Sequence, residues 1–291
     1  MLSRIVMTTA LTGLLAAGTT SVQAQQPTSS GQQAADPSGW TFNIAPYGWF
    51  ANLNVTSNLP LSPALGGTLS TSSSVGFGEL LSHLNFATMV AADAQYDRFS
   101  VLTDFMYLNV GGVASQIKSV NFLGLPSISI SRTLQTSVGM NLNAKIWTLA
   151  GGYTVLTGDW GNFDVIAGFR YLGIPISLDF SLALTLTGPR GNGATFGRIG
   201  SVSGTANLWN GIGGFRGRIR LGDTGLFIPY YFDAGAGGSN LTWQIASGLG
   251  YQTGWAGVSL TYRYLSFEQG SSAVLQHLSI KGPMIMANLT F

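Results

Sequence analysis

The amino-acid sequence predicts an all-β protein, folded as a closed antiparallel transmembrane β-barrel of about ten strands, with eight or twelve as alternatives. At the C-terminal end, Phe291, Leu289 and Ala287 alternate with Thr290 and Asn288, which is the period of a strand with one apolar face. Charged residues make up only 8% of the chain, against about 25% in soluble domains. After residue 24 no run of about 20 apolar residues could form a transmembrane helix. A closed barrel is the other structure that satisfies its backbone hydrogen bonds in lipid.

The N-terminal residues predict export. A basic start precedes an apolar run at 5–18 that is too short to span a bilayer, and Val22-Gln-Ala24 has small residues at the positions before a cleavage site. We therefore expect a signal peptide at 1–24, cleaved after Ala24. Residues 25–38 are polar and rich in turn formers, which predicts a mobile periplasmic leader. Residues 39–291 form the predicted barrel domain.

The turn signals alternate between short and long connections. Short turns fall near 97–98, 157–162, 222–225 and 253–254, and longer links near 56–82, 112–128, 188–204, 237–240 and 268–276. This alternation is typical of periplasmic turns and extracellular loops. The expected strands are 40–55, 84–97, 99–111, 131–155, 162–187, 205–221, 225–236, 241–252, 255–267 and 277–291.

The charges in these strands share a face. A Lys or Arg that faces the bilayer midplane costs about 2–4 kcal/mol, so charged residues belong in the lumen. The alternation assigns the following residues to a lumen charge network: Asp93, Asp97, Asp104, Lys145, Asp164, Arg170, Arg216, Arg218, Arg220, Asp233 and Arg263. Lys281 is the exception, and we expect it near the extracellular rim, where it can meet lipopolysaccharide phosphates.

One segment changes phase. Apolar residues occupy odd positions from Phe163 to Tyr171 and even positions from Ile174 to Leu186. Two explanations are open: a bulge near Gly173, or a hairpin that extends beyond the membrane.

The inner face predicts two functions. Five acids and six bases are nearly balanced, which favours ion pairs that plug a narrow lumen. The alternative is a narrow charge-selective channel for small solutes, with Arg216, Arg218 and Arg220 as its basic lining. The formal net charge of +2 gives no indication of a nucleic-acid partner.

Catalysis is not expected from the residues present, so the sequence predicts a protein that is not an enzyme. Cysteine is absent, which excludes thiol chemistry, and metal-ligand spacing and cofactor motifs are missing. His83 is expected in a loop or short helical turn over the barrel mouth. An omptin-like protease is disfavoured because the strand acids lie mostly at mid-depth or toward the periplasm.

His277, the second histidine of the chain, suggests a second alternative function. Gln-His277-Leu-Ser279 resembles the His-x-Ser pair of outer-membrane lipid A deacylases, with His as base and Ser as nucleophile. The acid that would orient the histidine should follow on the same stretch, yet no acid follows Ser279. A lipid A-modifying hydrolase therefore remains an alternative.

Several segments of the chain carry distinctive motifs: Trp40-x5-Pro46-Tyr47-x-Trp49, Phe77-Gly-Glu-Leu-Leu, Phe163-Asp164-Val-Ile-Ala-Gly168-Phe-Arg170-Tyr171, Asp233-x-Gly-x-Gly-Gly-Ser-Asn-Leu-Thr-Trp243-Gln244, Gly248-x-Gly250-Tyr251 and Tyr262-Arg263-Tyr264. Together these segments resemble a family of small porin-like Gram-negative outer-membrane β-barrel proteins. The chain departs from the family at 174–205, where a Gly/Thr/Ser-rich insertion enlarges one loop.

The resemblance implies an outer-membrane location and no particular activity. It implies that Phe291 and Leu289 are a C-terminal signal for the barrel-assembly machinery, and that outer-membrane lipid and lipopolysaccharide surround the barrel. No oligomeric state follows from it.

Overall fold

The computed structural model describes residues 39–60, 68–114, 116–121, 128–129, 138–187, 193–238 and 240–291. All of them belong to one compact unit, Pro37–Phe291. The expected signal peptide (1–24), its cleavage site at Ala24 and the leader (25–38) lie outside the described residues. Among the described residues, no helix is long and apolar enough to cross a membrane.

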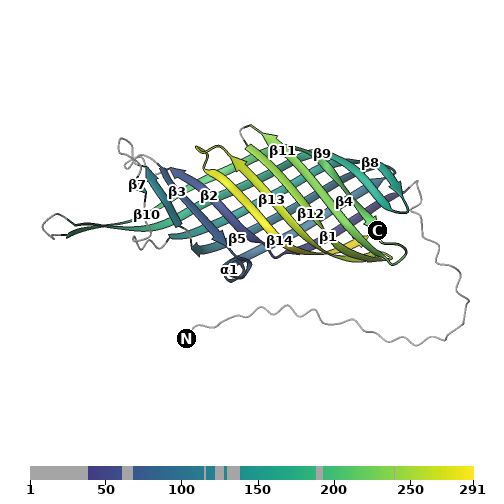
Figure 1. The fold of residues 1–291 in the computed structure, drawn as a ribbon, viewed down its shortest axis with the longest axis horizontal. Helices are drawn as coiled ribbons and strands as arrows, with labels where there is room; N and C mark the ends of the chain where they lie inside the picture. The colour runs from purple at the N-terminus through teal and green to yellow at the C-terminus, as the bar shows by residue number, and fades with distance from the viewer. Residues whose placement is uncertain are drawn as a thin grey trace, which may run out of the picture. The chain divides into compact units, whose positions relative to one another are not determined.

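Ten antiparallel strands close into a ring, which confirms the predicted fold class and strand number (Figure 1). In ring order they are β1 (Trp40–Trp49), β4 (Leu84–Tyr96), β5 (Phe99–Ala114), β8 (Val138–Gly158), β9 (Gly161–Thr187), β10 (Gly193–Arg220), β11 (Leu226–Gly237), β12 (Asn240–Thr253), β13 (Ala256–Gln269) and β14 (Leu275–Thr290).

The last strand closes the ring on the first. β1 pairs with β14 from Asn43↔Thr290 to Trp49↔Met284. Phe291 completes the seam, because its N–H donates to the carbonyl of Phe42 at 2.8 Å. Closure removes the free edge that an open sheet would expose.

Tight turns lie at the end of the barrel that carries Phe291, which we call the short-turn end. Asp97 and Arg98 join β4 to β5, and Asp97 has a φ of 51°, as the hairpin turns of this length require. Gly161 follows the turn before β9 with a φ of 135°, where a Cβ atom would overlap the carbonyl of Arg218. The predicted turn positions are confirmed at this end.

The opposite end, the long-loop end, continues as sheet where the sequence predicted a link at 56–82. That prediction is wrong, because β2 (Asn52–Pro60), β3 (Thr68–Val75) and the helix α1 (Phe77–Ser82) occupy this stretch. β2 continues along β14 in the register of β1, and β3 then pairs with β6 (Gln116–Asn121), which pairs with β7 (Ile128–Ser129). β2, β3 and β7 lie far from the C-terminus (Figure 1).

The phase change near Ile174 reflects an extended hairpin, and the expectation of a bulge is wrong. β9 and β10 stay paired without a register shift from Gly161↔Ile219 to Thr187↔Gly193. Even-numbered residues of β9 point inward from Asp164 to Ile176, since Asp164, Arg170 and Ile174 are all buried. The apolar residues change sides because the lumen changes from polar to apolar above Arg170.

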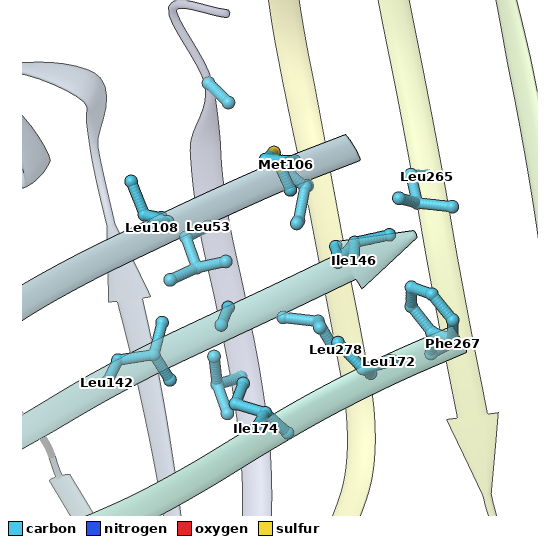
Figure 2. Close-up of a cluster of buried hydrophobic side chains, with 14 of the residues drawn as sticks. Leu53, Met106, Leu108, Leu142, Ile146, Leu172, Ile174, Leu265, Phe267 and Leu278 are labelled. Atoms are coloured by element: carbon cyan, nitrogen blue, oxygen red, sulfur yellow. The ribbon is translucent and has the colours of Figure 1, made fainter. Parts of the chain in front are cut away.

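The interior of the long-loop half is a packed apolar core. Inward side chains from opposite walls, such as Leu53, Leu142, Leu172 and Phe267, are at most 3% exposed and lie together (Figure 2). The outer wall of the short-turn half is the apolar surface instead, with Trp40, Phe42 and Ile44 exposed along β1.

Candidate functional site

A buried ion pair crosses the middle of the lumen. Arg170 on β9 donates from Nη1 to Asp233 Oδ1 at 2.8 Å and from Nη2 to Asp233 Oδ2 at 2.5 Å, and both side chains are completely buried. Thr148 Oγ1 and Thr242 Oγ1 accept further hydrogen bonds from the guanidinium at 3.1 and 3.2 Å. The two-pronged contact gives the pair a fixed geometry.

A second ion pair lies beside it. Arg263 on β13 donates from Nη2 to Asp104 Oδ2 at 2.7 Å, and its Nη1 donates to the hydroxyl of Tyr47 at 3.2 Å. The Tyr47 hydroxyl in turn donates to Asp104 Oδ1 at 2.6 Å. The guanidinium carbon lies 4.7 Å from the ring centroid of Trp49, so one face of the charge rests on an aromatic surface.

Gln244 on β12 joins the two pairs. Its Oε1 accepts from Arg263 Nη2 at 2.8 Å and from Arg170 Nη2 at 3.3 Å. We call Arg170, Asp233, Arg263, Asp104 and Gln244 the lumen belt. The belt draws on β5, β9, β11, β12 and β13, so it ties together strands from several sides of the ring.

A cavity of about 310 Å³ lies on the short-turn side of the belt, with Asp104, Gln244 and Arg263 at its inner end. Arg216 lies between two carboxylates in its wall, because Nη2 donates to Asp93 Oδ2 at 2.8 Å and Nε lies 3.5 Å from Asp164 Oδ2. Asp93, Asp164 and Arg216 are thus a second charge cluster.

Arg218 and Arg220 contribute differently from Arg216. Arg218 also lines the cavity and lies 5.7 Å from the ring of Phe227, whereas Arg220 is exposed beside the turn after β10. Within the part of the chain that is described, neither forms an ion pair with a carboxylate. The cavity wall carries three acids (Asp93, Asp104 and Asp164) and three bases (Arg216, Arg218 and Arg263), so its formal charge is balanced.

Two residues assigned to the lumen network from sequence lie elsewhere. Lys145 is exposed on the outer face of β8, 6.0 Å from the ring of Tyr107. Its even-numbered neighbours Ala144 and Ile146 point inward, so the assigned phase was wrong by one residue. Asp97 lies in the exposed turn between β4 and β5, where the strand alternation no longer applies.

The apolar core closes the lumen on the long-loop side of the belt. Leu172 and Ile174 follow Arg170 on β9 and are fully buried, and Leu265 and Phe267 follow Arg263 on β13 with at most 1% exposure. A solute that entered the cavity would meet the belt first and the apolar core behind it.

The two histidines lie outside the lumen belt. His83 follows α1 as its C-cap and its Nδ1 lies 3.0 Å from the carbonyl oxygen of Gly111. His277 and Ser279 share the outer face of β14, and Glu268 of β13 stands directly opposite His277 in the strand register. Ser279 Oγ accepts a hydrogen bond from Asn54 Nδ2 at 3.3 Å. An acid is thus opposite His277 in register on the preceding strand, where Glu268 Oε1 accepts a hydrogen bond from Ser266 Oγ at 3.5 Å.

Sequence reasoning missed the neutral members of the site. Tyr47, Gln244, Thr148 and Thr242 lie on inner faces by the same alternation that identified the charges. A search for uncharged hydrogen-bonding residues at belt depth on every strand would have found them, because a buried guanidinium needs several acceptors.

The strand order, the exposed apolar wall and the buried polar belt define a class of protein. The chain has the fold of the Gram-negative outer-membrane β-barrel proteins. No protein-family model and no curated protein sequence matches it.

Three similar solved structures share 8–15% sequence identity with this chain. The outer membrane protease OmpT from Escherichia coli shares 11% identity at a TM-score of 0.50, covering 88% of this chain and 97% of its own. The translocator domain of the autotransporter NalP from Neisseria meningitidis shares 15% identity at a TM-score of 0.37, covering 88% and 90%. Ail, the attachment invasion locus protein of Yersinia pestis, shares 8% identity at a TM-score of 0.31, covering 87% and 99%.

The prediction that this chain is not an enzyme is corrected by the first of these similarities. A barrel of this architecture is found in a protease, so the fold does not exclude catalysis. The expectation rested on the absence of cysteine, metal-ligand spacing and cofactor motifs, and a barrel can carry reactive side chains without any of these. At 11% identity the likeness concerns the fold alone and assigns no catalytic residue.

Proposed function

We propose that the chain is an integral barrel protein of the Gram-negative outer membrane whose lumen is closed to solutes. The proposal rests on one observation: the lumen is blocked twice along its length, first by the lumen belt and then by the apolar core behind it. A conducting pore needs a continuous polar path. The fully buried Arg170–Asp233 pair and the largely buried Arg263–Asp104 pair, followed by packed Leu, Ile and Phe side chains, offer none.

The outer surface of the short-turn half supports the membrane location. Exposed apolar side chains cover it, and aromatic pairs bracket them, with Trp40–Tyr96 at one level and Tyr171–Trp209 at the other. Such girdles mark the two interfaces of outer-membrane barrels. In this orientation the short turns face the periplasm and the long-loop half faces outward.

Two partners belong to this proposal. Lys281 lies on the outer face of β14 opposite Tyr264, where its charge suits a lipopolysaccharide phosphate. Phe291 is 67% exposed at the barrel seam, which suits recognition by the barrel-assembly machinery before closure.

The charge-selective channel is the competing function. It would use Arg216, Arg218 and Arg220, but the cavity that Arg216 and Arg218 line ends at the lumen belt, and Arg220 lies exposed beside the turn after β10. Reconstitution into planar bilayers separates the two. We expect no conductance steps from protein that shows heat-modifiable gel migration, while an open porin in the same bilayers gives regular steps. Regular steps from the purified chain would contradict the closed lumen.

A lipid A-modifying hydrolase is a second candidate, favoured by one observation. Glu268 stands opposite His277 on the outer wall, so an acid, a histidine and Ser279 share one face near the proposed outer leaflet. Release of acyl chains from purified lipid A tests it. Activity that is lost in Ser279→Ala and retained in Ser266→Ala, the neighbouring serine on β13, would support it, and no release by the unaltered protein would exclude it.

A further inference from the structure

The barrel wall is interrupted between β1 and β4. Their pairing ends at Pro46↔Val90, although β4 extends to Leu84. Proline has no N–H to continue the ladder of hydrogen bonds. If the strands stayed paired in this register for four more residues, Phe50 would lie opposite Phe86. On its other side β1 remains paired with β14 through Trp49, so only one seam is open.

An apolar pocket of about 200 Å³ lies at this interruption. Inward residues such as Trp49 and Met106 line it from the lumen side, and the outward Phe50 lines it from the wall. A Cβ atom built on Gly48, which also lines the pocket, would meet only the tip of the Phe50 ring, at 3.9 Å. The pocket therefore connects the outer surface of the barrel with the edge of the apolar core.

The helix α1 borders the pocket through Leu80 and Leu81. Its position is fixed at both ends: the N–H of Phe77 donates to Asn52 Oδ1 at 2.9 Å, and the N–H of Gly111 donates to the carbonyl of His83 at 3.0 Å. Leu80 is buried in the core, whereas Leu81 remains 56% exposed. The helix thus adds an exposed apolar side chain to the mouth of the pocket.

The pocket lies at a definite depth. Outward residues of β1 are apolar from Trp40 to Phe50, and the next outward residue, Asn52, is polar. Ten residues of a tilted strand cross the apolar band of about 25 Å. The interruption at 47–50 therefore falls in the outer third of the band, beside the acyl chains of the outer leaflet.

We propose that this pocket binds one hydrocarbon chain of an outer-leaflet lipid, which enters sideways between β1 and β4. None of the described lining residues is charged, and Tyr47, whose hydroxyl is engaged by Asp104, is the main polar group. A polar ligand would find few partners, whereas a hydrocarbon chain gains burial from water-free apolar contacts. The volume is below the roughly 300–1,000 Å³ of drug-sized sites and suits the end of a single chain.

The proposal rests on the proposed membrane location, and one experiment tests the two separately. The protein is placed in lipid nanodiscs containing a phospholipid with a diazirine near the end of one acyl chain, irradiated, and the labelled residues are mapped by mass spectrometry. Labels on outward residues such as Ile44 and Val90 report membrane embedding. Labels on the inward residues Ala87, Met89 or Met106 report a chain in the pocket, and we expect both sets.

Labelling confined to outward residues would overturn the pocket proposal while leaving the membrane location intact. Loss of all strand labels would overturn the membrane location. Ala87→Trp fills the pocket and is expected to reduce labelling of Met106 at least tenfold, without reducing labelling of Val90. Ala94→Trp, outward on the same strand, is the matched control and should leave the label on Met106 unchanged; heat-modifiable migration verifies that each variant is folded.

Discussion

The two halves of the barrel are built in opposite ways. In the short-turn half the lumen carries ion pairs and an open cavity, and the outer wall is apolar. In the long-loop half the interior is an apolar core, and outward residues such as Asn54 and Ser203 are polar. The ladder of β9 and β10 runs through both halves without a register shift.

The difference shows that the surroundings, and not the strand itself, determine which face is apolar. In lipid the outer face must be apolar and the polar groups turn inward. Beyond the membrane, water lies outside and the same inward positions form a core like that of a soluble protein. In the orientation proposed above, the change of phase along β9 therefore falls at the outer boundary of the membrane.

The largest loss of stability is expected from breaking an ion pair of the lumen belt. Arg170→Ala leaves Asp233 buried without its partner, and such a loss costs about 3–5 kcal/mol. Urea unfolding in detergent micelles or nanodiscs measures it. Arg170→Met combined with Asp233→Leu removes both charges and should recover much of the loss; a double variant no more stable than the single one would show that the charge left behind is not the cause.

A smaller loss of stability is expected from a change in the apolar core, at Leu172, two residues after Arg170 on β9. Leu172→Ala removes a completely buried side chain, which costs about 2–5 kcal/mol depending on how far the site relaxes. Ser203→Ala, exposed on the outside of the same half, should change the free energy of unfolding by less than about 0.5 kcal/mol. Similar unfolding curves for the two variants would mean that the long-loop half has no core of the kind described.

The smallest effect is expected at Lys145. Because its side chain is exposed on the outer face of β8, Lys145→Gln should alter the free energy of unfolding by less than about 0.5 kcal/mol. A loss comparable to that of Arg170→Ala would instead assign Lys145 to the lumen, as predicted from the sequence.

Much of the fold could be predicted because period-two alternation is strong wherever lipid covers one face. The strands near Asp93, Asp233 and Arg263 were assigned the correct faces, and the short turns were found from glycine and aspartate. The alternation failed where its physical cause is absent. In β2 and β3, Ser- and Thr-rich segments outside the lipid resemble loops, although they pair as strands.

The site was less predictable for a related reason. Alternation assigns a residue to a face but not to a partner, so the pairing of Arg170 with Asp233, across β9 and β11, needed the closed ring. Lys145 was misplaced because β8 is nearly as apolar on one face as on the other, with Trp147 and Leu149 outside and Ile146 inside. The acid opposite His277 was missed because antiparallel pairing brings Glu268 there from the preceding strand.

The central claim, that water fills one half of the lumen and is excluded from the other, can be tested with two inward alanines. The chain has no cysteine, so Ala91→Cys, lining the cavity, and Ala144→Cys, 2% exposed in the apolar core, each introduce a single thiol. A water-soluble thiol reagent applied to the folded protein in nanodiscs should modify the first variant readily and the second only after unfolding. Modification of both at comparable rates would show a continuous aqueous path and contradict the closed lumen.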